Sequence, residues 1–179
     1  MNKRHKLFWS VAAISFAGSL PPGILNTGVA GLVAGAGPLA AIAFGLGAIL
    51  AEMTIVRLAH AGTARRAIAP KFPRWLAIGL SLALISWTLL HASKNPAPSQ
   101  YAQYPFLAGL LLSTLNPLHL PFWLGWTVVL KGRNLLAGAT IEYHLFALAI
   151  GAGTTLAFLA YGTAGHFILQ WWQTGSSIK

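Results

Sequence analysis

The chain has 179 residues, of which 56 % are hydrophobic and only 8 % are charged. A soluble domain carries about 25 % charged residues, so this composition excludes a water-soluble protein and indicates a single integral membrane domain. The absence of cysteine excludes disulfides, thiolate metal sites and thiol redox enzymes.

The first two predicted spans come from residues 7–51, which contain no charged residue. This length is enough for two spans of about 20 residues each. We expect them at 7–33 and 39–59, with a turn at 34–38. The basic start resembles that of a signal peptide, but the apolar run is too long and no small-residue cleavage site stands out. We therefore expect the first span to be retained.

The second half adds predicted spans at 75–91, 105–130 and 141–161, followed by an interfacial tail at 162–179. The tail is short and contains two adjacent tryptophans, which favour the membrane interface. An alternative splits the last part into two short spans, 135–152 and 155–172, that turn at 151–154. The predicted fold is thus an all-α integral membrane protein with five transmembrane helices, or six if this alternative holds.

The basic residues are distributed unevenly over the two sides of this topology. With the N-terminus inside, only Lys94 and Lys179 lie outside. The cytoplasmic residues are Lys3, Arg4, Lys6, Arg57, Arg65, Arg66, Lys71, Arg74, Lys131 and Arg133. An excess of lysine and arginine on the cytoplasmic side is the usual pattern of multi-pass proteins in the inner (plasma) membrane. Topology therefore explains the net charge of +10 without a nucleic-acid partner.

Proline interrupts the first and fourth predicted spans. Pro21-Pro22-Gly23 removes helical partners from the carbonyl groups of Ala17 and Gly18. Asn116-Pro117 and Pro121 do the same in the fourth span, and we expect the carbonyl of Ser113 and, in part, that of Pro117 to be freed there. Broken helices at membrane depth form substrate and ion sites in many secondary transporters. The alternative is a pair of kinks without a ligand.

The two interrupted spans run in opposite directions, and each precedes a glycine-rich span. This arrangement predicts an inverted repeat with the site at its interface. Gly45 and Gly47 of the second span are expected to permit close helix approach.

Glu52 is one of only two acidic residues, and it lies inside the second span. A carboxyl group within a span is costly and suggests a function, here proton exchange or attraction of a cationic substrate group. The alternative is an ion pair with Arg57. Asn26 and Asn116 offer amide donors and acceptors beside the breaks, either for a zwitterionic substrate or as helix caps.

Three further titratable residues are candidates: His119 belongs with the binding residues above, and Glu142 and His144 are secondary. His119, beside the second break, could relay a proton or be a neutral histidine bonded within the bundle. Glu142 and His144 lie at the start of the fifth span, where pairing of Glu142 with Lys131 or Arg133 is the expected role. The histidines are scattered, so a metal site has little support, and we find no nucleophile–base motif or phosphate-binding loop.

Three motifs in order resemble the lysine exporter family, the LysE/RhtB-type amino-acid exporters. They are residues 20–26 (Leu-Pro-Pro-Gly-Ile-Leu-Asn), 45–52 (Gly-Leu-Gly-Ala-Ile-Leu-Ala-Glu) and 115–123 (Leu-Asn-Pro-Leu-His-Leu-Pro-Phe-Trp). Ile24 stands where the family has the second proline of Pro-Gly-Pro, and Leu118 where it often has lysine. The family's sixth span is missing or much shortened.

This resemblance implies a secondary transporter, not an enzyme, that exports amino acids or similar zwitterionic or cationic metabolites in exchange for protons. The expected partners are the lipid bilayer, the substrate and protons, with a homo-oligomer as an option and no cofactor. Two alternatives stay open. One is an exporter of divalent metal or other cations, and the other is a non-transporting membrane module that assembles with a partner.

Overall fold

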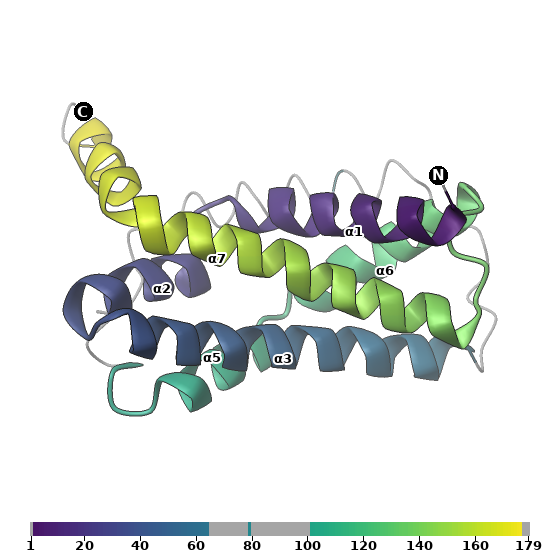
Figure 1. The fold of residues 1–179 in the computed structure, drawn as a ribbon, viewed down its shortest axis with the longest axis horizontal. Coiled ribbons are helices and arrows are strands. Elements are labelled where there is room, and N and C mark those ends of the chain that lie inside the picture. Colours follow the sequence, from purple (N-terminus) through teal and green to yellow (C-terminus); the bar gives the residue numbers. More distant parts are fainter. Residues whose placement is uncertain (1, 65–78, 80–100, 177–179) are drawn as a thin grey trace.

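The computed structural model describes residues 2–64, 79 and 101–176 of the chain (Figure 1). Within these ranges the chain is helical and contains no strand. The helices are α1 (Lys3–Ser19), α2 (Ile24–Gly35), α3 (Pro38–Ala64), α5 (Pro105–Thr114), α6 (His119–Gly132) and α7 (Thr140–Ser176). Apart from Gly79, the predicted third span, 75–91, lies outside the described residues.

The lengths and surfaces of these helices fit a membrane. Pro38–His60 in α3 and Thr140–Ala164 in α7 are each long and apolar enough to cross a bilayer. The described part thus holds two such helices, or four spans if the bent pairs α1/α2 and α5/α6 each count as one. Large apolar side chains also point outward along one face of α3, namely Leu39, Ile42, Leu46 and Leu50. Such a stripe is unfavourable in water but suits contact with lipid. The described part of the chain is therefore all-helical, as expected for an all-α membrane protein.

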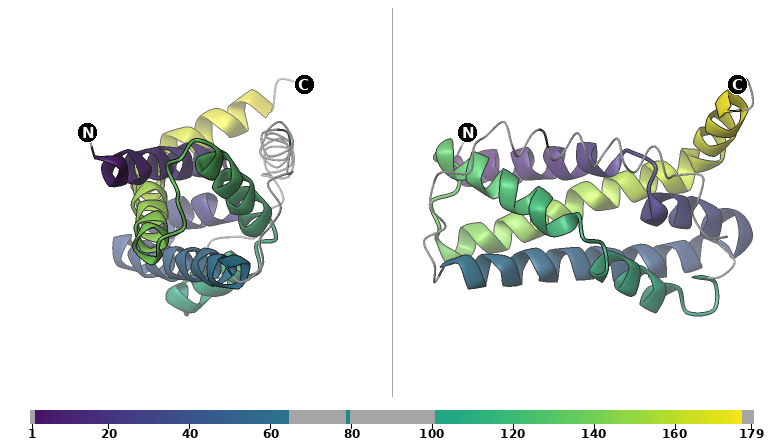
Figure 2. Two further views of the ribbon diagram at one scale, coloured as in Figure 1. Left: turned by 90° about the vertical axis from the view of Figure 1, so that its right-hand side faces the viewer. Right: turned by 180° about the vertical axis from the view of Figure 1, so that it is seen from behind.

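Both proline motifs break their helices. The axes of α1 and α2 differ by 75° and those of α5 and α6 by 61° (Figure 2). The breaks lie at residues 20–23 and 115–118, where the sequence predicted them. The predicted interruption at Pro121 is wrong. This residue lies in the first turn of α6, where a missing N–H has no helical partner to lose.

Helix α7 is longer than the predicted fifth span. It runs without interruption through residues 151–154, so the alternative turn there is wrong. It then continues to Ser176, through most of the predicted tail. Glycines are tolerated inside a membrane helix where a neighbouring helix packs closely against them, and both Gly151 and Gly153 have such a neighbour.

The long helices α3 and α7 each support the first part of a broken pair. Helix α1 packs along α7 and α5 packs along α3, while α3 and α7 also contact each other. Helix α2 contacts α7, and α6 contacts α3. The broken pair in each half of the chain therefore packs against the long helix of the other half: α1 and α2 against α7, and α5 and α6 against α3.

Two glycines bring α3 and α5 into backbone contact. A Cβ atom on Gly47 would lie 2.1 Å from the carbonyl oxygen of Phe106, and one on Gly109 would lie 2.0 Å from that of Phe44. Neither position can hold a side chain without separating the helices. The predicted close approach at Gly47 is confirmed, and at Gly45 the neighbour is the Phe158 ring.

Gly47→Ala should destabilise the protein. Alanine in place of glycine usually stabilises a helix by about 1 kcal/mol, but here the new methyl group meets backbone atoms, and overpacking costs about 1–3 kcal/mol. We expect a lower melting temperature in detergent. Gly162→Ala, whose Cβ would make ordinary contacts of 3.7 Å, is the matched control and should melt like the parent protein or slightly above it. Equal melting temperatures for both variants would contradict the close contact.

Candidate functional site

A layer of buried polar groups separates two apolar clusters in the bundle. The first cluster, near the end where the chain begins, includes Val11, Val56 and Phe146. The second includes Phe44 and Phe158. The polar layer lies between them along both long helices. On α3 it is Glu52, and on α7 it is Thr154.

The carboxyl group of Glu52 forms hydrogen bonds with side chains on two other helices. Its side chain is 6 % exposed. The indole N–H of Trp123 on α6 donates to Oε1 at 2.9 Å, and the hydroxyl of Thr154 lies 2.9 Å from Oε2. The Thr154 hydroxyl is also 3.0 Å from that of Ser15 on α1, and the Ser15 hydroxyl is 2.9 Å from the carbonyl oxygen of Ile150. Three helices thus meet at or next to one carboxyl group on a fourth.

Each hydroxyl carries one proton, so the direction of this chain depends on the protonation of Glu52. If Glu52 is ionised, Thr154 donates to it, and the Ser15 proton must serve either Thr154 or Ile150. If Glu52 is neutral, Oε2 donates to Thr154, Thr154 donates to Ser15, and Ser15 donates to Ile150. Every contact is then a hydrogen bond with its own proton. The arrangement can hold a proton on Glu52 without leaving a group in the chain unpaired.

The site lies one helical turn from each break. Ser15 is one turn before the end of α1 at Ser19, and Trp123 is one turn after the start of α6 at His119. Along α3, Glu52 is about 21 Å of helix from Pro38 and about 12 Å from His60, at 1.5 Å per residue. The carboxyl group therefore sits well inside the apolar segment.

Close packing around the breaks fixes this geometry. A Cβ on Gly153 of α7 would lie 2.3 Å from the Ala12 carbonyl oxygen, so α1 and α7 touch through their backbones next to Thr154. A Cβ on Gly18 of α1 would lie 2.8 Å from the Phe122 ring of α6. The last turn of α1 and the first turn of α6 are thus in contact.

Side chains satisfy the carbonyl groups of the first break. The Asn26 amide nitrogen donates to Ser19 O at 2.5 Å and to Pro21 O at 2.9 Å. The Tyr161 hydroxyl of α7 donates to Leu20 O at 2.7 Å. Asn26, which is 5 % exposed, therefore caps the break, and its amide donor is occupied.

Two carbonyl groups that were predicted to lack a hydrogen-bond partner accept hydrogen bonds from backbone N–H groups. The Leu20 N–H donates to Ala17 O at 3.4 Å, and the Asn116 N–H donates to Ser113 O at 3.2 Å. These bonds join residues three apart, so tighter turns at the helix ends replace the lost α-helical partners. The prediction of open carbonyls at these two positions is wrong.

Three of the predicted binding residues lie at the second break, between α5 and α6. The Asn116 side-chain oxygen accepts from the Leu118 N–H at 3.1 Å, which stabilises the turn, and Pro117 is exposed. His119 is half-buried, and its Nδ1 is buried with no hydrogen-bond partner among the described residues. The structure thus places Asn116 and Pro117 in the connecting turn and His119 one turn from Trp123.

Glu142 anchors the start of α7. It accepts from the backbone N–H groups of residues 137–138 at 2.6 and 3.0 Å, and Lys3 donates to it at 3.2 Å. The predicted partners, Lys131 and Arg133, are wrong. The Lys131 Nζ atom instead lies over the ring of Tyr143, 5.9 Å from the ring centre. Glu142 is thus a structural carboxylate at the end of the bundle.

The alternative partner of Glu52 is also wrong. Among the described residues, no ion pair joins Glu52 to Arg57. Arg57 instead lines a groove between α3 and α7 together with His144. Glu52 therefore has neutral hydrogen-bond partners, unlike a carboxylate neutralised by an arginine.

Sequence reasoning missed four polar residues around the site: Ser15, Trp123, Thr154 and Tyr161. A second set of buried polar contacts was also missed, in which His60 lies 2.8 Å from the Thr127 hydroxyl, which itself donates to Trp123 O. The sequence held only a weak indication of these residues. Ser15 and Thr154 are hydroxyl residues within spans that are otherwise largely apolar, at a depth similar to that of Glu52.

In the part of the chain that the structure describes, no three histidine, aspartate or glutamate side chains gather to hold a metal ion. Comparison with protein-family models, curated proteins and solved structures finds no match to this chain.

Proposed function

We propose that this protein is a proton-coupled secondary transporter that exports amino acids or similar small zwitterionic or cationic metabolites. One observation carries the proposal: a carboxyl group inside an apolar span has no basic partner among the described residues, and its hydrogen-bond network reaches Ser15 and Trp123, each one turn from a helix break. An intramembrane carboxyl group is expensive and is by default a functional residue. Glu52 is the proposed site of the coupling proton.

The helix pattern supports an inverted repeat. Exchanging α1, α2 and α3 for α5, α6 and α7 converts the α1–α7 contact into the α5–α3 contact, and α2–α7 into α6–α3, whereas the α2–α3 contact has no comparable α6–α7 counterpart among the described residues. In transporters built from such repeats, the substrate site lies at the repeat interface near the bilayer midplane. Here that interface contains Glu52 and Trp123, with the two breaks on either side.

The substrate class rests on the resemblance to the lysine exporter family. The proposed substrate site comprises Pro21, Pro22, Gly23 and Asn26 at the first break with Asn116, Pro117 and His119 at the second. Because Asn26 already bonds backbone carbonyls, we propose that it shapes the site and that substrate contacts come from groups around it. We propose that the Nδ1 of His119, which has no hydrogen-bond partner among the described residues, makes such a contact.

Transport by purified protein in liposomes tests this proposal. Labelled amino acids would be supplied under an imposed pH gradient, with protein-free liposomes and a collapsed gradient as controls. We expect gradient-dependent accumulation of at least one amino acid. If no amino acid accumulates but a divalent cation does, the metal-exporter alternative is favoured. If nothing is transported, the protein is better described as a module that assembles with a partner.

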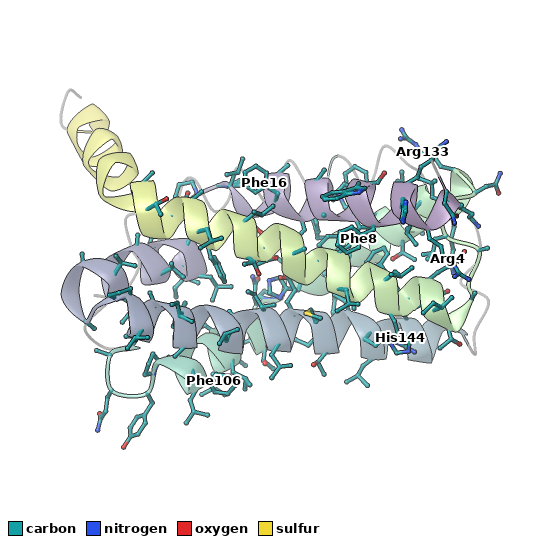
Figure 3. All side chains as sticks on the ribbon, viewed as in Figure 1. Arg4, Phe8, Phe16, Phe106, Arg133 and His144 are labelled. Atoms are coloured by element: carbon teal, nitrogen blue, oxygen red, sulfur yellow. The ribbon has the colours of Figure 1, made fainter. Side chains whose placement is uncertain are left out.

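We propose that the N-terminus is cytoplasmic in the cell inner (plasma) membrane. Arg4 and Arg133 lie at the same end of the bundle (Figure 3), which agrees with the basic bias of the sequence. Reporter fusions after Arg66, Lys94, Arg133 and Lys179 should read in, out, in and out. A cytoplasmic reporter at Lys179 would contradict the five-span topology.

A further inference from the structure

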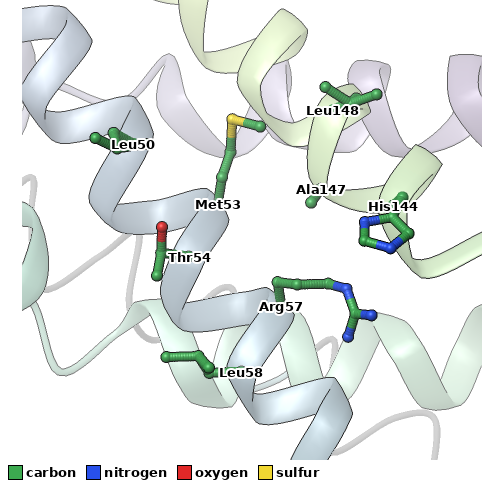
Figure 4. A pocket seen from close by; sticks show the side chains of 8 residues that line it. All are labelled: Leu50, Met53, Thr54, Arg57, Leu58, His144, Ala147 and Leu148. Atoms are coloured by element: carbon green, nitrogen blue, oxygen red, sulfur yellow. The ribbon is translucent and has the colours of Figure 1, made fainter. Parts of the chain in front are cut away.

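A groove of about 350 Å³ opens between α3 and α7 on the outside of the bundle (Figure 4). Its apolar walls include Leu50, Leu58 and Leu148, each more than half exposed. In a bilayer such outward-facing leucines contact lipid chains. The groove therefore faces the membrane and not the interior of the protein.

Two basic side chains line the same groove. Arg57 of α3 and His144 of α7 extend into the space between the helices. Arg57 lies three residues before the end of the apolar segment Pro38–His60, and His144 lies four residues after the start of Thr140–Ala164. These offsets correspond to about 4.5–6 Å of helix, so both groups are close to the membrane interface.

Arg57 has no counter-charge from the acidic side chains of its own chain. The sequence contains only two of them. Glu52 is bonded to Trp123 and Thr154, and Glu142 is bonded to Lys3. The Nε atom of Arg57 is buried and has no hydrogen-bond partner among the described residues. A guanidinium group in this position calls for an anion from outside the chain.

We propose that this groove binds an anionic phospholipid, with its phosphate on Arg57 and His144 and an acyl chain along the leucines. Basic pockets between transmembrane helices on the cytoplasmic side are known to suit anionic headgroups. The guanidinium binds phosphate oxygens through paired N–H donors. The lipid supplies the anion and covers the apolar walls at once, which free phosphate would not do. The proposal is independent of the transport function.

Lipid binding to the purified protein tests the inference. Melting temperature and native mass spectrometry would be measured in detergent with added dioleoyl phosphatidylglycerol, dioleoyl phosphatidylcholine or inorganic phosphate. We expect phosphatidylglycerol to be retained and to raise the melting temperature, and the other two to have little effect. Stabilisation by inorganic phosphate alone would overturn the lipid assignment. A doubled mass that Arg57→Gln returns to the monomer would show a second copy in the groove and overturn it too.

Two variants and a control locate the site. Arg57→Gln should lower the apparent affinity for phosphatidylglycerol about fivefold, the ratio expected for one interfacial basic residue. His144→Glu changes an exposed residue and offers Arg57 a carboxylate within the groove, so it should have the same effect without disturbing the core. Arg133→Gln removes an exposed charge at the same end and should bind like the parent protein. Unchanged binding in His144→Glu, or equal losses in all three variants, would refute the groove as the site.

Discussion

Glu52→Gln should abolish gradient-driven export while leaving the protein folded. Glutamine has the shape of the neutral acid. Its amide oxygen can accept from Trp123, and its amide nitrogen can donate to Thr154, so the chain to Ser15 keeps its bonds. The variant cannot release a proton, however. Moving one elementary charge across a membrane potential of about 100 mV is worth about 2.3 kcal/mol. At that potential, loss of the coupled charge removes an accumulation ratio of about fiftyfold.

The measurement is uptake and exchange in liposomes as the pH gradient is varied. If Glu52 holds the coupling proton, driven transport is lost and substrate exchange persists in Glu52→Gln. If Glu52 binds the substrate ammonium, both fall together. Glu142→Gln is the matched control because it changes the other carboxyl group, at the end of α7, and it should keep coupling. A Glu52→Gln protein with the pH dependence of the parent would exclude Glu52 and turn attention to His119.

Replacing both prolines of the first break, Pro21→Ala with Pro22→Ala, should also abolish transport. The two new N–H groups can bond to the carbonyl groups of residues 17 and 18, which favours a continuous helix in place of the 75° bend. A straight helix would draw Asn26 and Tyr161 away from the carbonyl groups that they now cap. The site beside the break would then lose its shape.

Pro121→Ala is the control for this experiment. Pro121 lies in the first turn of α6, where its replacement neither adds a needed bond nor removes a bend. We expect normal transport from Pro121→Ala and none from the double variant, with both recovered from membranes at similar levels. Normal uptake kinetics in the double variant would show that the first break is a kink without a role in transport.

The parts of the fold that follow from local sequence were predictable. Two adjacent prolines cannot continue a helix, and a long uncharged stretch can form spans, so the breaks and the helical class follow from the chain itself. Pro121 shows the limit of this reasoning. A proline has different effects in the first turn and in the interior of a helix, and the position of the first turn depends on where the preceding break ends.

The partners of the polar residues were not predictable because they lie far away in the sequence. Glu142 pairs with Lys3, 139 residues distant, and not with the nearby Lys131. Glu52 bonds Thr154 across 102 residues, although Arg57 is only five positions away. Only the packing of α1 and α3 against α7 brings these groups together, and no local pattern specifies it.

The separation between Glu52 and Thr154 has a consequence for synthesis of the protein. Ribosomes add about 5–20 residues per second, so Thr154 emerges about 5–20 s after Glu52. During that interval the carboxyl group must enter the bilayer, or wait at its edge, without its α7 partner. The neutral acid is the form that hydrocarbon admits at lower cost. Co-translational delays before α7 should therefore expose the nascent chain to membrane proteases.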